Sequence, residues 1–300
     1  MLKIKAWFSA LRLRTLTLSL SGILLGSGAA HYNNHWNNKI FFLAILTSIL
    51  FQIISNLAND LGDGIKGTDN NNRIGPTRAV QSGIISKKEM KIGIILTSIL
   101  SILSSLLLIY YSLNGMPYYI IIFFIILAIL CIVAAISYTL GASPYGYYGF
   151  GDIMVYIFFG FVSVIGVYTL FAKSFLSINI LLAIFIGSIS TAVLNLNNMR
   201  DFENDKKCNK NTLVVKIGIK KAKNYHIILI LSALISIALY FNTLQEPMAF
   251  LALIPSIVLF KHMWKIIYTN NLKEFDSELK IVSLTGFFLS INTLITLIVL

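Results

Sequence analysis

The chain has 300 residues, of which 57% are hydrophobic and only 12% are charged, and its mean hydropathy is +0.80. This composition excludes a water-soluble globular domain, whose surface needs a larger charged share. Long unbroken apolar runs, such as residues 92–108 and 120–136, exclude a membrane β-barrel, whose strands alternate between apolar and polar residues. The two cysteines have no CxxC spacing, which argues against a disulfide framework or a thiolate metal site. The sequence therefore predicts an all-α integral membrane protein.

The apolar runs predict the number and direction of the membrane spans. With about 20 residues per crossing, nine transmembrane helices are expected in a single domain over residues 1–300, at 15–32, 40–59, 91–112, 118–140, 151–171, 175–196, 225–242, 247–265 and 281–299. Of the 24 basic residues, 22 lie on one side of the membrane, and only Lys39 and Lys173 lie in connections on the opposite side. Because basic loops remain in the cytoplasm, the N-terminus and the long loops are predicted to be cytoplasmic and the C-terminus to lie outside. The net charge of +12 then reflects topology and contact with anionic lipids, and nucleic-acid binding is not expected.

Half of the twelve acidic residues fall in two short segments, each beginning where a span ends on the cytoplasmic side. The first segment carries Asn56, Asn59, Asp60 and Asp63 at helical spacing, followed by Asp69. The second segment repeats every four residues, at Asn197, Asp201 and Asp205. Each spacing places the polar groups on one helix face. The matching positions of the two segments suggest a weak internal repeat.

Two acidic helix faces, each next to a basic loop, predict a metal and phosphate site. Carboxylates this close repel each other unless a cation lies between them. Oxygen ligands without histidine or thiol favour a hard cation such as Mg²⁺, which leaves coordination positions for substrate phosphate. The same loops supply cations for a diphosphate: Lys66, Arg73 and Arg78 in the first, and Lys206, Lys207 and Lys210 in the second. One acidic helix end or one basic loop alone would be explained by solvation and topology.

These residues carry a resemblance to a known family. The segments QIISNLANDLGDGIKGTDNNNRIGPTRAVQSG from Gln52 and NNMRDFENDKKCNKNTLVVKIG from Asn197 resemble the two aspartate motifs of the UbiA superfamily of membrane prenyltransferases. Together with YTLGASPYGYYGFGDIMVYIFFG from Tyr138, they are most similar to the subgroup that prenylates 1,4-dihydroxy-2-naphthoate. Where many members have a third acid in NDxxDxxxD, this chain has Gly67, and Asp69 follows as in that subgroup. The subgroup's Arg-Pro near the N-terminus is Arg12-Leu13 here.

The resemblance implies a reaction, its substrates and the residues that serve it. A polyprenyl group would pass from its diphosphate to 1,4-dihydroxy-2-naphthoate with loss of the carboxylate, giving demethylmenaquinone at a bacterial cytoplasmic membrane. Asp63, Asp201 and Asp205 are the expected catalytic carboxylates. The expected Mg²⁺ ligands are Asn59, Asp63, Asp201 and Asp205, supported by Asp60 and Asp69. The expected groups for the diphosphate are Lys66, Arg73, Arg78, Lys206 and Lys210, with Arg12 on the acceptor side.

The connection after the fourth span is rich in glycine and tyrosine and lacks basic residues. Tyr138 and Tyr145 are expected to shield an allylic cation by cation–π contact. Asp152 is expected to orient or deprotonate the acceptor. An interfacial belt of tyrosines among lipid headgroups explains the same aromatic residues equally well.

Two other functions fit parts of the sequence. A UbiA-type enzyme of the 4-hydroxybenzoate or chlorophyll type would carry the same motifs with a different aromatic acceptor. A divalent-cation or phosphate transporter also places paired acids in membrane helices, but near the bilayer midplane and on broken helices. In this sequence the acids fall at span ends, which favours the enzyme.

Overall fold

The computed structural model describes residues 2–70 and 73–300, and over these residues the secondary structure is entirely helical. The elements in chain order are α1 (Leu2–Leu11), α2 (Leu13–Tyr32), α3 (Asn38–Lys66), α4 (Lys87–Leu113), α5 (Tyr118–Ser137), η1 (Tyr145–Tyr148), α6 (Gly151–Val155), the π-helix η2 (Tyr156–Gly166), α7 (Val167–Ala172), α8 (Asn179–Arg200), α9 (Phe202–Lys207), α10 (Leu213–Ile217), α11 (Ile219–Thr243), η3 (Pro247–Ser256), α12 (Ile257–Tyr268) and α13 (Glu274–Val299).

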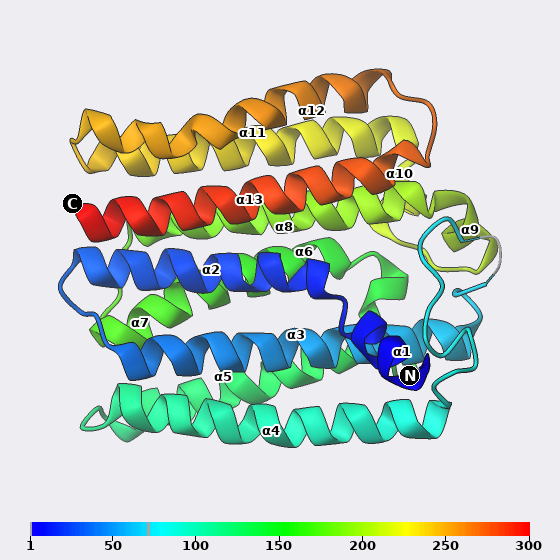
Figure 1. Cartoon of the computed structure of the whole chain (residues 1–300), viewed down its shortest axis with the longest axis horizontal. Helices are drawn as coiled ribbons and strands as arrows, with labels where there is room; N and C mark the ends of the chain where they lie inside the picture. Colours follow the sequence, from blue (N-terminus) through cyan, green and yellow to red (C-terminus); the bar gives the residue numbers. More distant parts are fainter. Residues whose placement is uncertain (1, 71–72) are drawn as a thin grey trace.

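The long helices lie side by side in one bundle (Figure 1). Within the described ranges, eight helices are long and apolar enough to cross a membrane, and the pair Leu2–Leu11 and Thr15–Tyr32, bent by 43°, brings the number to nine if it forms one span. The prediction of about nine spans therefore agrees with the structure. The two termini lie at opposite ends of the bundle, and α1, α9 and the loop between α3 and α4 gather at the N-terminal end (Figure 1).

Several helices extend beyond the predicted spans. α3 continues to Lys66, seven residues past the expected end, so Asp60 and Asp63 lie within the helix and Asp69 follows it. α4 begins with the capping box that the sequence indicates, in which Ser86 and Glu89 exchange hydrogen bonds, and this cap ends the preceding loop. α13 begins at Glu274, seven residues before the predicted span. These extensions place charged side chains at the N-terminal end of the bundle.

α8 is the central helix of the bundle. It packs against α11, α13 and η2, and 72% of its most apolar window is buried within the protein. By contrast, α5 packs only on α3 and α4 among its main neighbours, and 17% of its window is buried. The apolar side chains exposed on α4 and α5, such as Leu103 and Phe123, suit a lipid environment. The protein is therefore a multi-pass membrane bundle with a buried axis and an apolar periphery.

Small residues allow the close helix contacts of the interior. The sequence predicts close approach at Gly22, Gly26, Gly160 and Gly166. A Cβ on Gly26 would lie 2.5 Å from the Val164 carbonyl oxygen, and a Cβ on Gly22 would lie 2.0 Å from Ser163 Oγ. A Cβ on Gly160 would lie 2.6 Å from the Ala183 carbonyl oxygen. The prediction is wrong for Gly166, where a Cβ would meet nothing within 4 Å, because this glycine faces a cavity.

Substitution of two glycines of the same π-helix is expected to give opposite results. Gly160→Ala forces the backbone of η2 away from α8, so it should destabilise the fold by about 1–3 kcal/mol. Gly166→Ala adds a methyl group to open space and should leave the melting temperature near the parental value. Thermal unfolding of the purified variants in detergent measures both. Equal melting temperatures would contradict the packing described for Gly160.

Candidate active site

Asp60 and Asp63 lie one turn apart on α3, and their carboxylates bind different groups. Both Asp60 oxygens accept backbone hydrogen bonds, from Ala79 N at 3.1 Å and from Val80 N at 3.0 Å. This pair of bonds folds the loop after α3 back onto the helix and fixes the segment next to Arg78. The Asp60 side chain therefore positions the loop through both of its carboxylate oxygens.

Asp63 lies in a buried group of polar side chains that the second acidic segment completes. The Tyr147 hydroxyl donates to Asp63 Oδ1 at 2.7 Å, and Lys210 Nζ lies 3.3 Å from both carboxylate oxygens. Burial by itself would lower the pKa of Lys210, but Asp63 and Asp205 raise it, so the lysine stays charged. Lys66 is exposed and lies over the Tyr147 ring at 5.1 Å. Lys210, rather than Lys66, is thus the lysine that contacts the first motif.

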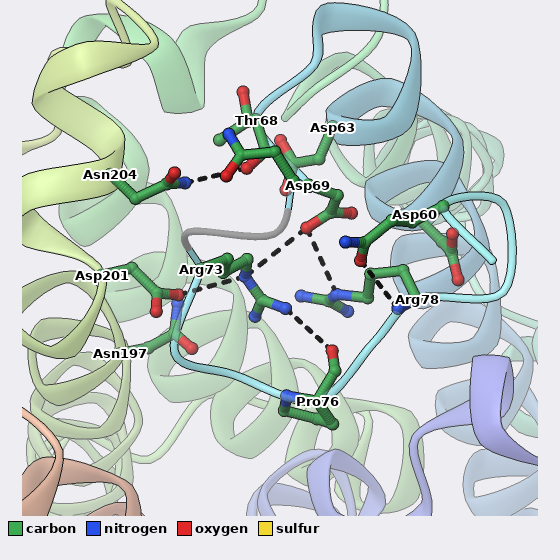
Figure 2. Close-up of polar contacts among 12 residues, drawn as sticks. Asp60, Asp63, Thr68, Asp69, Arg73, Pro76, Arg78, Asn197, Asp201 and Asn204 are labelled. Carbon is green, nitrogen blue, oxygen red and sulfur yellow. Dashed lines mark hydrogen bonds and ion pairs between the residues drawn. The ribbon is translucent and has the colours of Figure 1, made fainter.

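Two arginines of the α3–α4 loop link the motifs. Arg73 Nε lies 3.4 Å from Asp69 Oδ1 and 3.3 Å from Asp201 Oδ2, and Arg78 Nε lies 3.6 Å from Asp69 Oδ1 (Figure 2). Neither Asp69 oxygen has a hydrogen-bond partner, although the side chain is fully buried. Burial, followed by repulsion from Asp63, raises the pKa of Asp69 to about 7. The two motifs, more than 130 residues apart in sequence, therefore meet in space through Arg73.

The second motif begins where α8 ends, and Arg200 holds its first carboxylate. Arg200 Nε and Nη2 donate to the two oxygens of Asp201 at 3.0 and 2.7 Å. The remaining donors reach Asn197 Oδ1 at 2.7 Å and Asp276 Oδ1, on α13, at 2.6 Å. Sequence reasoning counted Arg200 only as a topological charge, and its position next to Asp201 was the one available signal. Nothing in the sequence pointed to Asp276.

The short helix α9 carries the rest of the second motif. Asn204 Nδ2 donates to the Thr68 carbonyl oxygen at 2.8 Å (Figure 2), while Asn204 Oδ1 has no hydrogen-bond partner. Asp205 is 3% exposed, and burial raises its pKa to about 7 despite the nearby charge of Lys210. Lys206 is exposed on the same helix. The structure thus brings Asp205 and Lys210 toward Asp63 and leaves Lys206 on the surface.

A cavity of about 380 Å³ opens beside the motifs and continues into the bundle. Its polar end is lined by Arg12, Asn59, Asp63, Arg78, Asn197 and Lys210. Its apolar part continues between α2, α3, α5 and η2 to residues such as Ala44, Phe124 and Leu170, which lie near the opposite ends of their helices. From Ala44 to Asp63 along α3 is roughly 28 Å at 1.5 Å per residue. The shape provides a charged mouth and a long apolar interior.

Four further predicted residues differ in how they relate to this cavity. Tyr138 and Tyr145 both line it, with their rings 5.3 Å apart in an edge-to-face arrangement. Arg12 also lines it, and its Nη2 is buried without a hydrogen-bond partner. Asp152 lies outside this cavity and lines a second one, whereas the Tyr138 ring lines the first and packs against Gly151. The structure therefore places Asp152 away from the space where an acceptor would meet the motifs.

Residues 16–291 match the UbiA prenyltransferase family. The chain belongs to that family. It is 43% identical over 236 residues to the 1,4-dihydroxy-2-naphthoate octaprenyltransferase of Escherichia coli (strain K12), which covers 79% of this chain and 76% of that protein. It is 46% identical over 233 residues to the protein of the same name from Haemophilus influenzae, which covers 76% and 74% of the two chains.

Two solved structures share the UbiA fold with this chain. A UbiA homolog from Archaeoglobus fulgidus, bound to DMAPP and Mg²⁺, superimposes with a TM-score of 0.61 at 16% identity, over 95% of this chain and 98% of that one. A structure from work on digeranylgeranylglyceryl phosphate synthase superimposes with a TM-score of 0.61 at 19% identity over the whole of both chains. At these identities the likeness concerns the fold.

The donor set at the motifs suits the divalent cation that the UbiA family implies. All candidate ligands are carboxylate or amide oxygens, and the oxygens of Asp69 and Asn204 Oδ1 accept no hydrogen bond, although Asp69 Oδ1 pairs with Arg73 and Arg78. Across residues 2–70 and 73–300, no three acidic, histidine or cysteine side chains are grouped closely enough to hold a metal alone. Mg²⁺ needs only one or two carboxylates when water and phosphate oxygens complete its coordination. The residues present therefore fit Mg²⁺ bound together with a diphosphate.

The two lysines of the second motif provide a matched pair of variants. Lys210→Met removes a buried cation beside Asp63 and should lower the rate of pyrophosphate release about a hundredfold. Lys206→Met changes an exposed side chain and should leave the rate near the parental value. Steady-state kinetics with a prenyl diphosphate compare the two, with monodispersity in detergent as the check of folding. A larger loss for Lys206→Met would contradict the placement of these lysines.

Binding of Mg²⁺ is expected to strengthen as the pH rises. The pKa values of Asp69 and Asp205 are both near 7, so these carboxyls are mostly protonated at about pH 6 and mostly ionised at about pH 8. Because a metal ligand must be deprotonated, the half-saturating Mg²⁺ concentration should fall roughly tenfold over this range for each of the two carboxyls that binds the ion. Calorimetric titration with Mg²⁺ and inorganic pyrophosphate measures it. A flat profile would show that neither carboxyl takes part.

Proposed function

We propose that the protein transfers a polyprenyl group from its diphosphate to 1,4-dihydroxy-2-naphthoate, with loss of the carboxylate, giving demethylmenaquinone for menaquinone biosynthesis. The main support is the meeting of the two motifs at the mouth of an apolar cavity, where Arg73 spans Asp69 and Asp201. Two relatives at 43% and 46% identity carry the name of this octaprenyl transfer. The position of the acids at the end of the bundle, on an unbroken α3, does not suit a transporter.

The diphosphate is proposed to lie among the cations at the cavity mouth. Lys210 and Arg78 line the polar end of the cavity, and the buried Arg12 Nη2 has a free donor for an oxyanion. Arg73 adds a further charge beside Asp69 and Asp201. The polyprenyl tail would then extend into the apolar interior, where each buried methylene contributes about 0.8 kcal/mol. The membrane-embedded bundle can thus bind both ends of an amphipathic donor.

The chemical step is a substitution at the allylic carbon. The bond between this carbon and the diphosphate oxygen breaks, and its electron pair leaves with the diphosphate. The ring carbon of the acceptor supplies the new bond, and the carboxylate departs as carbon dioxide. Mg²⁺, held by Asp63, Asp201 and Asp205 with Asn59 and Asp69 in support, would supply charge stabilisation on the departing diphosphate.

The chain's own residues assist this step by placing charge and excluding water. Lys210, Arg78 and Arg12 stabilise the developing negative charge, as fixed cations do in a dry site. Tyr138 and Tyr145 present aromatic rings at the cavity wall, where they can stabilise an allylic cation. Asp60 and Arg200 act through other groups: Asp60 holds the loop amides, and Arg200 orients Asp201.

The distribution of charge also suggests how the enzyme is oriented in the membrane. The motif end of the bundle carries nearly all the basic residues, so it is proposed to face the cytoplasm of a bacterial inner membrane. The dihydroxynaphthoate would enter from that side, and the prenyl tail from the lipid. Residues 1–300 are proposed to form one catalytic domain, because α13 packs on both α2 and α8 and joins the two ends of the chain.

The reaction is tested by the mass of its product. The purified protein is incubated with Mg²⁺, prenyl diphosphates of increasing length and either 1,4-dihydroxy-2-naphthoate or 4-hydroxybenzoate. A prenylated, decarboxylated naphthoquinol from the first acceptor alone supports the proposal. Prenylation of 4-hydroxybenzoate instead would assign a different acceptor, and no pyrophosphate release with either acceptor would exclude the transferase.

Substitution of one central carboxylate in each motif tests the contribution of the two motifs separately. Asp63→Ala and Asp201→Ala should each lower Mg²⁺-dependent pyrophosphate release by about a hundredfold to a thousandfold, because each removes an oxygen ligand. Glu203→Ala, on the exposed face of α9, is the control and should stay near the parental rate. Activity near the parental level in Asp63→Ala or Asp201→Ala would remove that residue from the site.

A further inference from the structure

A second cavity, of about 440 Å³, lies on the side of α6 away from the motif cavity. It is lined by Gly149, Phe150, Asp152, Ile153, Tyr156, Leu213, Tyr225 and Leu229. On the same helical segment, Met154 and Val155 line the motif cavity instead. A molecule in the second cavity would therefore be separated from the diphosphate by α6 itself. The reaction proposed above makes no use of this space.

Asp152 gives the second cavity an unbalanced negative charge. Its side chain is deeply buried, with 5% of the residue exposed. Tyr225 donates a hydrogen bond to the carboxylate, while Oδ1 has no partner. Among the ion pairs of the described residues, none includes Asp152. A buried carboxylate without a cation is costly, so this position favours a ligand that brings a positive charge.

The walls of the cavity suit such a cation. Phe150, Tyr156 and Tyr225 line the same cavity as the carboxylate, and aromatic rings attract ammonium groups. At the rim, Lys216 Nζ lies 3.2 Å from the position of a Cβ on Gly149 and 5.9 Å from the Phe150 ring. Lys216 donates to the Tyr148 carbonyl oxygen at 2.6 Å and has no acidic partner among the described residues. A lysine next to two of the lining residues, Gly149 and Phe150, thus accompanies the carboxylate inside the cavity.

The surroundings indicate where the ligand comes from. Phe150 and Ile153 are 59% and 56% exposed, and Ile228 on α11 is 63% exposed beside the cavity wall. These apolar side chains need lipid next to them, whereas the lysines of α10 and of the start of α11 lie at the end of the bundle that carries the charged loops. The cavity therefore opens where lipid headgroups meet acyl chains.

We propose that the second cavity binds the headgroup of a phospholipid that carries a primary ammonium group. The ammonium donates to Asp152 and lies against Phe150, Tyr156 and Tyr225, while the phosphate lies near Lys216. The acyl chains follow the exposed apolar surface at Ile153 and Ile228. A trimethylated headgroup cannot donate a hydrogen bond to Oδ1, and a glycerol headgroup brings no positive charge. The site is therefore selective for the primary amine.

Native mass spectrometry of the whole protein tests this site. The protein is released from nanodiscs that contain phosphatidylethanolamine, phosphatidylcholine or phosphatidylglycerol, and the fraction carrying one lipid is measured at increasing lipid fractions. Phosphatidylethanolamine should half-saturate one site at a mole fraction at least tenfold below that of the other two lipids. Added phosphoethanolamine, without acyl chains, distinguishes the headgroup alone from the intact lipid and should compete only weakly.

Three variants identify the residues involved. Asp152→Asn should raise the half-saturating fraction of phosphatidylethanolamine about tenfold, and Lys216→Gln, at an exposed position, should raise it without risk to folding. Glu246→Gln makes a matched charge change on an exposed residue at the other end of the bundle and should leave it unchanged. Equal binding of the three lipids by the parental protein would overturn the proposal. So would parental binding of phosphatidylethanolamine by both Asp152→Asn and Lys216→Gln.

Discussion

The structure depends on how buried carboxylates are paired with cations at one end of an apolar bundle. Asp63 and Asp69 come from the first motif and Asp201 from the second, and all three side chains are buried, where an unpaired carboxylate is unfavourable. Lys210 compensates Asp63, and Arg73 lies between Asp69 and Asp201. Removal of one partner from a buried pair typically costs about 3–5 kcal/mol. The ion pairs that stabilise these buried carboxylates therefore also hold the two motifs together.

The rest of the fold positions these pairs. Asp60 fixes the α3–α4 loop through the amides of Ala79 and Val80, which sets the place of Arg78. Arg200 joins the end of α8 to Asp276 on α13, so the first turn of the last helix supports the second motif. Gly75 packs so closely on Arg200 that a Cβ there would lie 2.9 Å from Nη2. Three distant segments thus converge on one arginine, which gives Asp201 a fixed orientation.

The apolar part of the bundle indicates which kind of ligand the charged site binds. A site for diphosphate alone needs no cavity that continues along α3 toward Ala44. Here the cations lie at the mouth of that cavity, so a ligand with an anionic head and a long apolar tail satisfies both regions. α5 and η2 line the cavity from two sides while packing on different neighbours, α5 on α3 and α4, and η2 on α2 and α8.

The sequence by itself determined the helical bundle, the approximate spans, the sidedness of charge and the chemistry of the two motifs, because hydropathy and helical spacing are local properties of the chain. The tertiary structure decided which groups meet. It placed Lys210, rather than Lys206 or Lys66, in contact with Asp63, and it paired Asp60 with backbone amides. It also placed Asp152 in a second cavity and brought Asp276 to Arg200. Those outcomes depend on loop paths and on the approach of helices far apart in sequence, where a difference of one turn moves a side chain from a buried contact to the surface.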